Sequence, residues 1–156
     1  MLRKECWIAP AVLILDRVTK IAAEGLPPEG RILIPGVLGL RYVRNTGVAF
    51  SLFSQVPFLP AVLTAAVLIA AFFLLRKKKL SPLPFCGLMA MLGGALGNLI
   101  DRVFSGSVPD MIEPLFVSFA IFNVADIGIT VGCGLVMLYL LLPEKGRRDG
   151  SPNGTQ

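Results

Sequence analysis

Histidine is absent from this 156-residue sequence, and cysteine and charged residues are scarce. Without histidine, the serine- and cysteine-based hydrolytic mechanisms that need an imidazole base are excluded, as are metal sites with histidine ligands. The three cysteines, Cys6, Cys86 and Cys133, are far apart and form no C-x-x-C pair. We therefore expect neither a disulfide framework nor a zinc site, and we interpret these cysteines as small buried apolar residues.

Charged residues make up only 16% of the sequence, whereas hydrophobic residues make up 54%. A soluble domain of this length needs more polar groups to cover its surface. Roughly 20 apolar residues cross a bilayer. Apolar runs near that length occupy residues 7–23, 57–75, 82–100 and 121–142. The sequence thus predicts an all-α membrane protein with four transmembrane helices, forming a single membrane domain over residues 1–156.

The segments between these spans differ in character. Residues 24–56 contain Gly and Pro, and polar and apolar residues alternate at 31–34 and 40–43. This pattern is typical of short strands and turns, so we predict a small β-containing platform outside the membrane, between the first and second spans. Residues 103–120 form a shorter connector, and the polar tail at 144–156 is expected to be disordered.

Basic residues predict the orientation of the chain in the membrane. They cluster at residues 3–4, 76–79 and 145–148, and each cluster flanks an apolar run. The positive-inside rule then places both chain ends in the cytoplasm and the platform and connector on the outer face. The net charge of +5 does not indicate nucleic-acid binding, because no aromatic residues alternate with these cations to form a stacking platform.

Ionisable residues within spans are costly and are therefore candidates for function. Asp16 and Lys20 are four residues apart in the first span, so they share a helix face and can pair. Such a pair would neutralise itself and anchor the span near the outer interface. Glycines spaced four apart at 93–97 and 128–132 would let the third and fourth spans approach another helix closely.

Two N-x-x-D patterns lie near the outer ends of the third and fourth spans, and Asp110 lies in the connector between them. The patterns pair Asn98 with Asp101 and Asn123 with Asp126. Carboxylates in one low-dielectric site tend to share a proton, which provides a base for water and an acid for a scissile carbonyl or leaving amine. This is the hydrolytic apparatus open to a chain without histidine or an evident metal cluster. On these residues alone, a protease, a small transporter or proton relay, and a structural scaffold all remain open.

Five motifs together resemble the lipoprotein signal peptidases, or type II signal peptidases. They are DRVTK at 16–20, NTGVAFS at 45–51, GGALGNLIDR at 93–102, VPD at 108–110 and FNVAD at 122–126. The resemblance implies a multi-pass aspartic protease of the bacterial inner membrane, with its site toward the extracytoplasmic face. It implies removal of signal peptides from prolipoproteins, with the cut placed just before a cysteine that carries a diacylglyceryl group.

The same resemblance implies roles for individual residues, and no cofactor or metal. Asp110 and Asp126 would be the catalytic pair. The residues that hold substrate or position the pair would be Asn45, Gly47, Asn98, Asp101, Arg102 and Asn123. Asp16 and Lys20 match the first-span motif with either a structural or a catalytic role. The partners implied are a diacylated prolipoprotein and membrane lipid, and a bundle with its own pair of aspartates is expected to act as a monomer.

Overall fold

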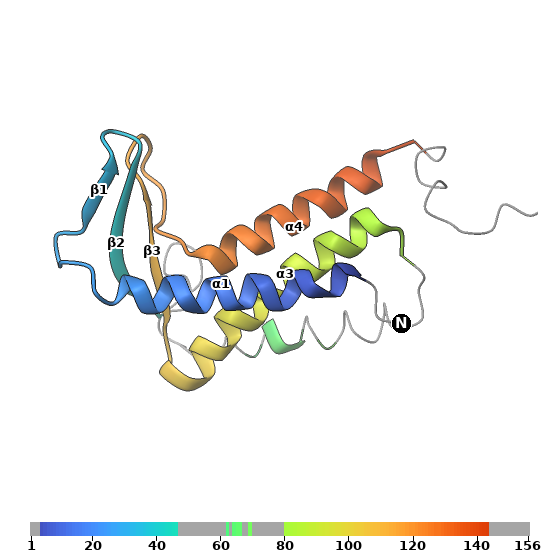
Figure 1. Cartoon of the computed structure of the whole chain (residues 1–156), viewed down its shortest axis with the longest axis horizontal. Helices are drawn as coiled ribbons and strands as arrows, with labels where there is room; N and C mark the ends of the chain where they lie inside the picture. Colours follow the sequence, from blue (N-terminus) through green and yellow to red (C-terminus); the bar gives the residue numbers. More distant parts are fainter. Residues whose placement is uncertain (1–3, 47–61, 63, 67–68, 70–79, 144–156) are drawn as a thin grey trace, which may run out of the picture.

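The structure is a computed structural model that describes residues 4–46, 62, 64–66, 69 and 80–143. In this part of the chain, helices α1 (Ile8–Ala23), α3 (Pro82–Ser105) and α4 (Val124–Leu141) run lengthwise, and a small sheet lies at one end of them (Figure 1). A 3-10 turn, η1 (Lys4–Trp7), precedes α1. The predicted second span lies largely outside the described residues, as do Gly47, the basic residues 76–79 and the tail. Residues 62, 64–66 and 69 of that span are helical.

The ends of α3 follow from its sequence. Pro82 occupies its first turn, where the missing N–H of proline costs no hydrogen bond. The helix stops before Gly106, which adopts the left-handed conformation with φ 66°. The third span was predicted to end at residue 100, but the helix continues to Ser105. It does so because Asp101 and Arg102 are buried by the fold and do not mark an exit into water.

The sheet has three antiparallel strands in the order β1 (Arg31–Ile34), β2 (Leu38–Asn45) and β3 (Val108–Pro114). The two strands predicted from alternation, at 31–34 and 40–43, are confirmed. No strand was assigned to the connector at 103–120, but β3 lies within it and pairs along β2 with Leu40 opposite Ile112. The register shifts between Leu40 and Val43.

Hydrogen bonds beside the sheet also set the start of α4. Phe122 forms a bridge to Ile112 on the free side of β3, with N···O distances of 2.8 and 3.1 Å, and it accepts a further bond from the Met111 N–H. Asn123 is extended and caps the helix, which begins at Val124 and not at residue 121. The strand and the helix start are therefore held together by the backbone.

Glycines bring the three helices together. The Cα of Gly87 in α3 lies so close to α4 that an added Cβ would be 2.6 Å from the Gly132 carbonyl oxygen. Gly94 likewise faces the Ala125 carbonyl of α4, and Gly93 faces the Ala9 carbonyl of α1. The predicted close approach at the spaced glycines is confirmed, and α3 packs against both α1 and α4, which also contact each other.

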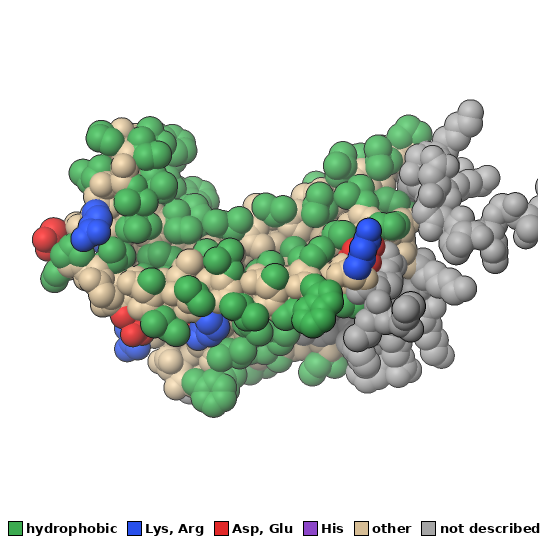
Figure 2. Space-filling model, viewed as in Figure 1, with side chains coloured by type: hydrophobic (Ala, Val, Ile, Leu, Met, Phe, Trp, Pro, Cys, Tyr) green, Lys and Arg blue, Asp and Glu red, His purple; other side chains and the backbone are tan. Residues whose placement is uncertain are grey.

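The outward faces of these elements are apolar. Large hydrophobic side chains stand exposed along α1 and α4, among them Ile14, Val18, Val131 and Leu138. Figure 2 shows hydrophobic surface over most of the visible face, with few charged groups. Within the described residues, α3 and α4 are long and apolar enough to cross a membrane. Exposed apolar surface on this scale indicates contact with lipid or another protein.

Candidate active site

Asp110 lies in β3 opposite Val43 of β2, and its side chain is 3% exposed. Two amides donate to its carboxylate: Asn45 Nδ2 at 2.9 Å and Asn123 Nδ2 at 2.6 Å. Burial, followed by the negative charge of Asp126, raises the pKa of Asp110 from 3.8 to about 6. The two amides and the charge of Lys20 act in the opposite direction. This carboxyl therefore holds a proton at a pH where an ordinary aspartate has lost it.

Asp126 occupies the third position of α4, where it completes a capping box with Asn123. Its backbone N–H donates to Asn123 Oδ1 at 3.0 Å, and its Oδ2 accepts from the Asn123 N–H at 3.2 Å. Its other oxygen accepts from Asn98 Nδ2 of α3 at 2.8 Å. The carboxylate is thus fixed by its own helix start and by the neighbouring helix.

Asn123 connects the two carboxylates and is completely buried. Its side-chain oxygen caps the helix of Asp126, while its Nδ2 donates to Asp110 and contacts Asn98 Oδ1 at 3.2 Å. The bridge from Phe122 to β3 holds the backbone directly before it. The placement of Asp110 and Asp126 relative to each other is therefore set by one buried amide and one backbone bridge.

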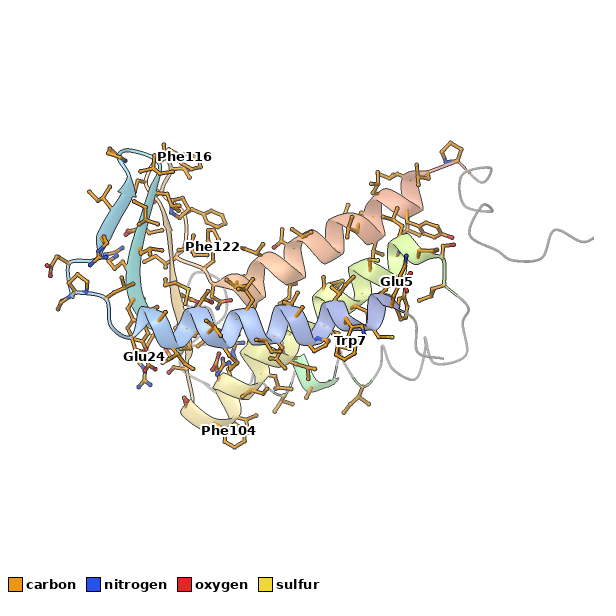
Figure 3. All side chains as sticks on the ribbon, viewed as in Figure 1. Glu5, Trp7, Glu24, Phe104, Phe116 and Phe122 are labelled. Carbon is orange, nitrogen blue, oxygen red and sulfur yellow. The ribbon has the colours of Figure 1, made fainter. Side chains whose placement is uncertain are left out.

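Both aspartates line one cavity of about 520 Å³. Its polar wall is formed by Asn45, Asn98, Arg102, Asp110, Asn123 and Asp126. The rest of its lining is mainly apolar and is formed by Val108, Ile127, Thr130, Val131 and residues 119–122. In Figure 3, Phe122 lies where the sheet meets the start of α4. A cavity with a mainly apolar lining and a pair of acids suits a substrate that is mostly hydrophobic around one polar bond.

Behind the polar wall lies a cluster of four charged residues. Lys20 Nζ contacts Asp16 at 2.8 Å and Asp101 at 2.7 Å, and Asp101 also accepts from Arg17. Asp16 and Lys20 are 0% and 2% exposed. The predicted pairing of Asp16 with Lys20 is confirmed.

The structure adds links that the sequence did not predict. Asp16 Oδ1 accepts the Ala125 N–H of α4 at 3.1 Å. The role of Arg17 was also missed, because its partner Asp101 is far away in sequence. Its only early signal was its position within the first-span motif.

The predicted site residues therefore divide into two groups. Asn45, Asn98, Arg102 and Asn123 join the two aspartates at the cavity. Asp16, Lys20 and Asp101 lie together in the charged cluster, and Gly47 falls outside the described residues. Within the described ranges, no group of three acidic, cysteine or histidine side chains could hold a metal ion.

Comparison with known proteins identifies the family. Residues 8–142 match the family model described as Signal peptidase (SPase) II. A lipoprotein signal peptidase of Enterococcus faecalis is 43% identical over 128 residues, which cover 81% of this chain and 79% of that protein. One from Lactococcus lactis subsp. cremoris is 45% identical over 135 residues, with 85% and 89% covered.

Solved structures agree with the sequence comparisons. A bacterial membrane enzyme determined by the in meso method at 2.3 Å resolution has a TM-score of 0.79 and 30% identity, with 97% of this chain and 94% of that chain covered. A second, at 1.9 Å resolution, has a TM-score of 0.77 and 33% identity, with 88% and 92% covered. These matches extend over nearly the whole described architecture, helices and sheet alike. The chain is therefore a membrane protein that belongs to the signal peptidase II family of aspartic proteases.

Proposed function

We propose that this protein removes signal peptides from prolipoproteins, cutting before a cysteine that carries a diacylglyceryl group, with Asp110 and Asp126 as its catalytic pair. One observation carries the assignment of the pair. A carboxylate from the sheet and a carboxylate from a helix face the same cavity, and a single buried asparagine holds both. The family membership supplies the reaction class, and the cavity supplies the place for it.

In this reaction the pair holds one proton. The ionised carboxylate takes a proton from water, and the water oxygen bonds to the scissile carbonyl carbon while the protonated carboxyl donates to the carbonyl oxygen. The C–N bond then breaks, and the leaving amine of the cysteine takes a proton from the pair. The raised pKa of Asp110 suits it to hold the shared proton at the start of the cycle.

The rival function, a small transporter or proton relay, places ionisable groups along the depth of a membrane bundle. Here the described aspartates form one cluster. Asp16 and Asp101 meet at Lys20, and Lys20 reaches Asp126 through Asn98. Asp110 joins the cluster through Asn123. A cluster beside a cavity favours a catalytic site over a path across the membrane.

The proposal includes the membrane topology: four spans in the bacterial inner membrane, both chain ends in the cytoplasm, and the sheet on the outer face. At that face, the acyl chains of a lipidated cysteine would keep the scissile bond near the membrane surface. Reporter fusions after residues 79 and 153 should read as cytoplasmic, and a fusion near residue 29 as external. A cytoplasmic reading near residue 29 would contradict this orientation.

The decisive experiment is cleavage by the purified protein in detergent. We expect it to cleave a diacylated prolipoprotein and leave the same prolipoprotein without lipid intact. Asp110→Asn and Asp126→Asn should each lower kcat by about 10²–10⁴-fold, because each amide removes a group that transfers the proton. Glu113→Gln is the matched control, since this carboxylate lies in the same strand but pairs with Arg41 at the surface. Near-normal turnover by either aspartate variant would remove that residue from the catalytic pair.

A further inference from the structure

Lys20 contacts a neutral amide in addition to two carboxylates. Its Nζ lies 2.8 Å from Asp16 Oδ2, 2.7 Å from Asp101 Oδ2 and 2.9 Å from Asn98 Oδ1. An ammonium group has three N–H donors and no acceptor, so each donor has one of these partners. Two of the bonds pair it with carboxylates. The third is made to a neutral amide in the wall of the cavity.

That third bond determines which way the Asn98 amide faces. Its oxygen accepts from Lys20 and also from Asn123 Nδ2 at 3.2 Å, while its nitrogen donates to Asp126 Oδ1 at 2.8 Å. In the flipped orientation, the amide nitrogen would face two donors and the amide oxygen would face a carboxylate. Each buried polar group left without a partner costs about 1–3 kcal/mol. Because Lys20 can only donate, it excludes the flipped orientation.

We propose that Lys20 is a positioning residue for the catalytic pair: it holds the Asn98 amide in the orientation that donates to Asp126 and thereby orients that carboxylate toward the cavity. This inference rests on the proposed function of Asp126. It assigns to Lys20 an effect on turnover that is separate from its contribution to folding.

The backbone beside Asp126 is held from the same side. Asp16 Oδ1 accepts the Ala125 N–H at 3.1 Å, and its other oxygen is bound by Lys20. Gly97 leaves room for this carboxylate, since a Cβ there would lie 2.6 Å from Asp16 Oδ2. Helix α1 therefore reaches the side chain of Asp126 through Lys20 and Asn98. It holds the backbone of the preceding residue, Ala125, through Asp16, which Lys20 also binds.

The test must separate positioning from charge balance, because Asp16, Arg17, Lys20 and Asp101 together carry no net charge. We therefore compare two double variants that each remove one cation and one anion. Lys20→Met/Asp101→Asn loses the contact with Asn98, whereas Arg17→Met/Asp101→Asn keeps it. A third, Lys20→Gln/Asp101→Asn, removes the same charge as the first but restores an N–H donor near Asn98.

The readouts are kcat and KM on the diacylated prolipoprotein, together with the thermal midpoint in detergent. We expect the Lys20→Met double to have a kcat about 10- to 100-fold below the Arg17→Met double, with KM within about threefold. The glutamine double should recover part of that loss. Equal kcat values for the Lys20→Met and Arg17→Met doubles would overturn the proposal. A Lys20→Gln double as slow as the Lys20→Met double would also overturn it, because the loss would then come from the charge of Lys20 alone.

Asn98→Asp keeps the proposal testable if the Lys20 variants do not fold. It preserves an oxygen toward Lys20 and replaces the N–H that faces Asp126. We expect a loss of kcat of about tenfold or more with little change in KM, and near-normal turnover would overturn the proposal. Cleavage by the wild-type protein separates the two proposals. If the wild-type protein cleaves the lipidated substrate, the proposed function stands even when the role of Lys20 is refuted.

Discussion

Replacing Asp110 by asparagine should lower kcat by about 10²–10⁴-fold and, at alkaline pH, stabilise the fold. The carboxyl is 3% exposed, and its pKa rises from 3.8 to about 6 on folding. The folded protein therefore binds the proton more tightly than the unfolded chain. The stability that this protonated carboxyl contributes is fully present below pH 4. It is lost as the pH rises through 6, when the buried group must ionise. The pKa difference corresponds to roughly 3 kcal/mol at pH 8.

Asparagine removes this cost but introduces a smaller one. It has nearly the same shape as aspartate, and its oxygen can still accept from Asn45 or Asn123. The amide nitrogen of the new asparagine, however, faces whichever of these two donors its oxygen does not accept from. That donor loses a hydrogen bond worth about 1 kcal/mol. The net expectation at pH 8 is a gain of about 2 kcal/mol, or roughly 4–8 °C in thermal midpoint for a chain of this size. Below pH 4 the gain should disappear and become a small loss.

The measurement is thermal unfolding of both proteins in the same detergent at several pH values between 4 and 8. The informative quantity is the difference between variant and wild type as a function of pH, since this cancels effects common to both. A variant that lost more stability at pH 8 than at pH 4 would refute the reasoning, because it would mean that the ionised carboxylate stabilises the fold. Glu113→Gln, in the same strand, should show no comparable pH-dependent gain.

Three further predictions concern the pH profile, helix packing and metal dependence. Asn45→Ala removes a donor that lowers the pKa of Asp110, so the pH at which kcat falls on the basic side should move upward by about 1–2 units; a downward shift in the kcat profile would contradict this. Gly87→Ala should destabilise the fold by about 1–3 kcal/mol, because its Cβ would meet the Gly132 carbonyl, whereas Gly134→Ala, with no described atom within 4 Å, should be neutral or stabilising in the same thermal assay. Excess EDTA should leave turnover unchanged; a loss that zinc restored would argue against catalysis by two carboxylates alone.

Local sequence predicted those features whose cause is local. The spacing of Asp16 and Lys20 on one helix face predicted their ion pair, and alternation predicted β1 and β2. The N-x-x-D spacing at Asn123 and Asp126 also has a local meaning, since it forms a capping box. The ion pair and the capping box each join residues three or four positions apart on one helix, and the alternation lies within a single strand, so a short window of sequence contains each signal.

Features built across the chain could not be read in this way. The strand β3 contains Pro109 and Pro114 and two acidic residues, a composition that is poor for a strand. It forms because β2 pairs along one of its edges and Phe122 bridges the other. The bond from Lys20 to Asn98 likewise depends on the packing of α1 against α3, which no local pattern determines.

The two catalytic candidates depend on different parts of the fold, and this explains why a membrane enzyme of this size carries a sheet. The helices alone would position Asp126, through the cap of α4 and the contact with Asn98. Asp110 also accepts from Asn123 at the start of α4, but its backbone lies in a proline-containing strand whose position comes from β2 and the bridge to Phe122. Without the sheet the bundle would hold one carboxylate in place and lack the second. Substitutions that break the pairing of β2 with β3 should therefore lower kcat even where the helices remain folded.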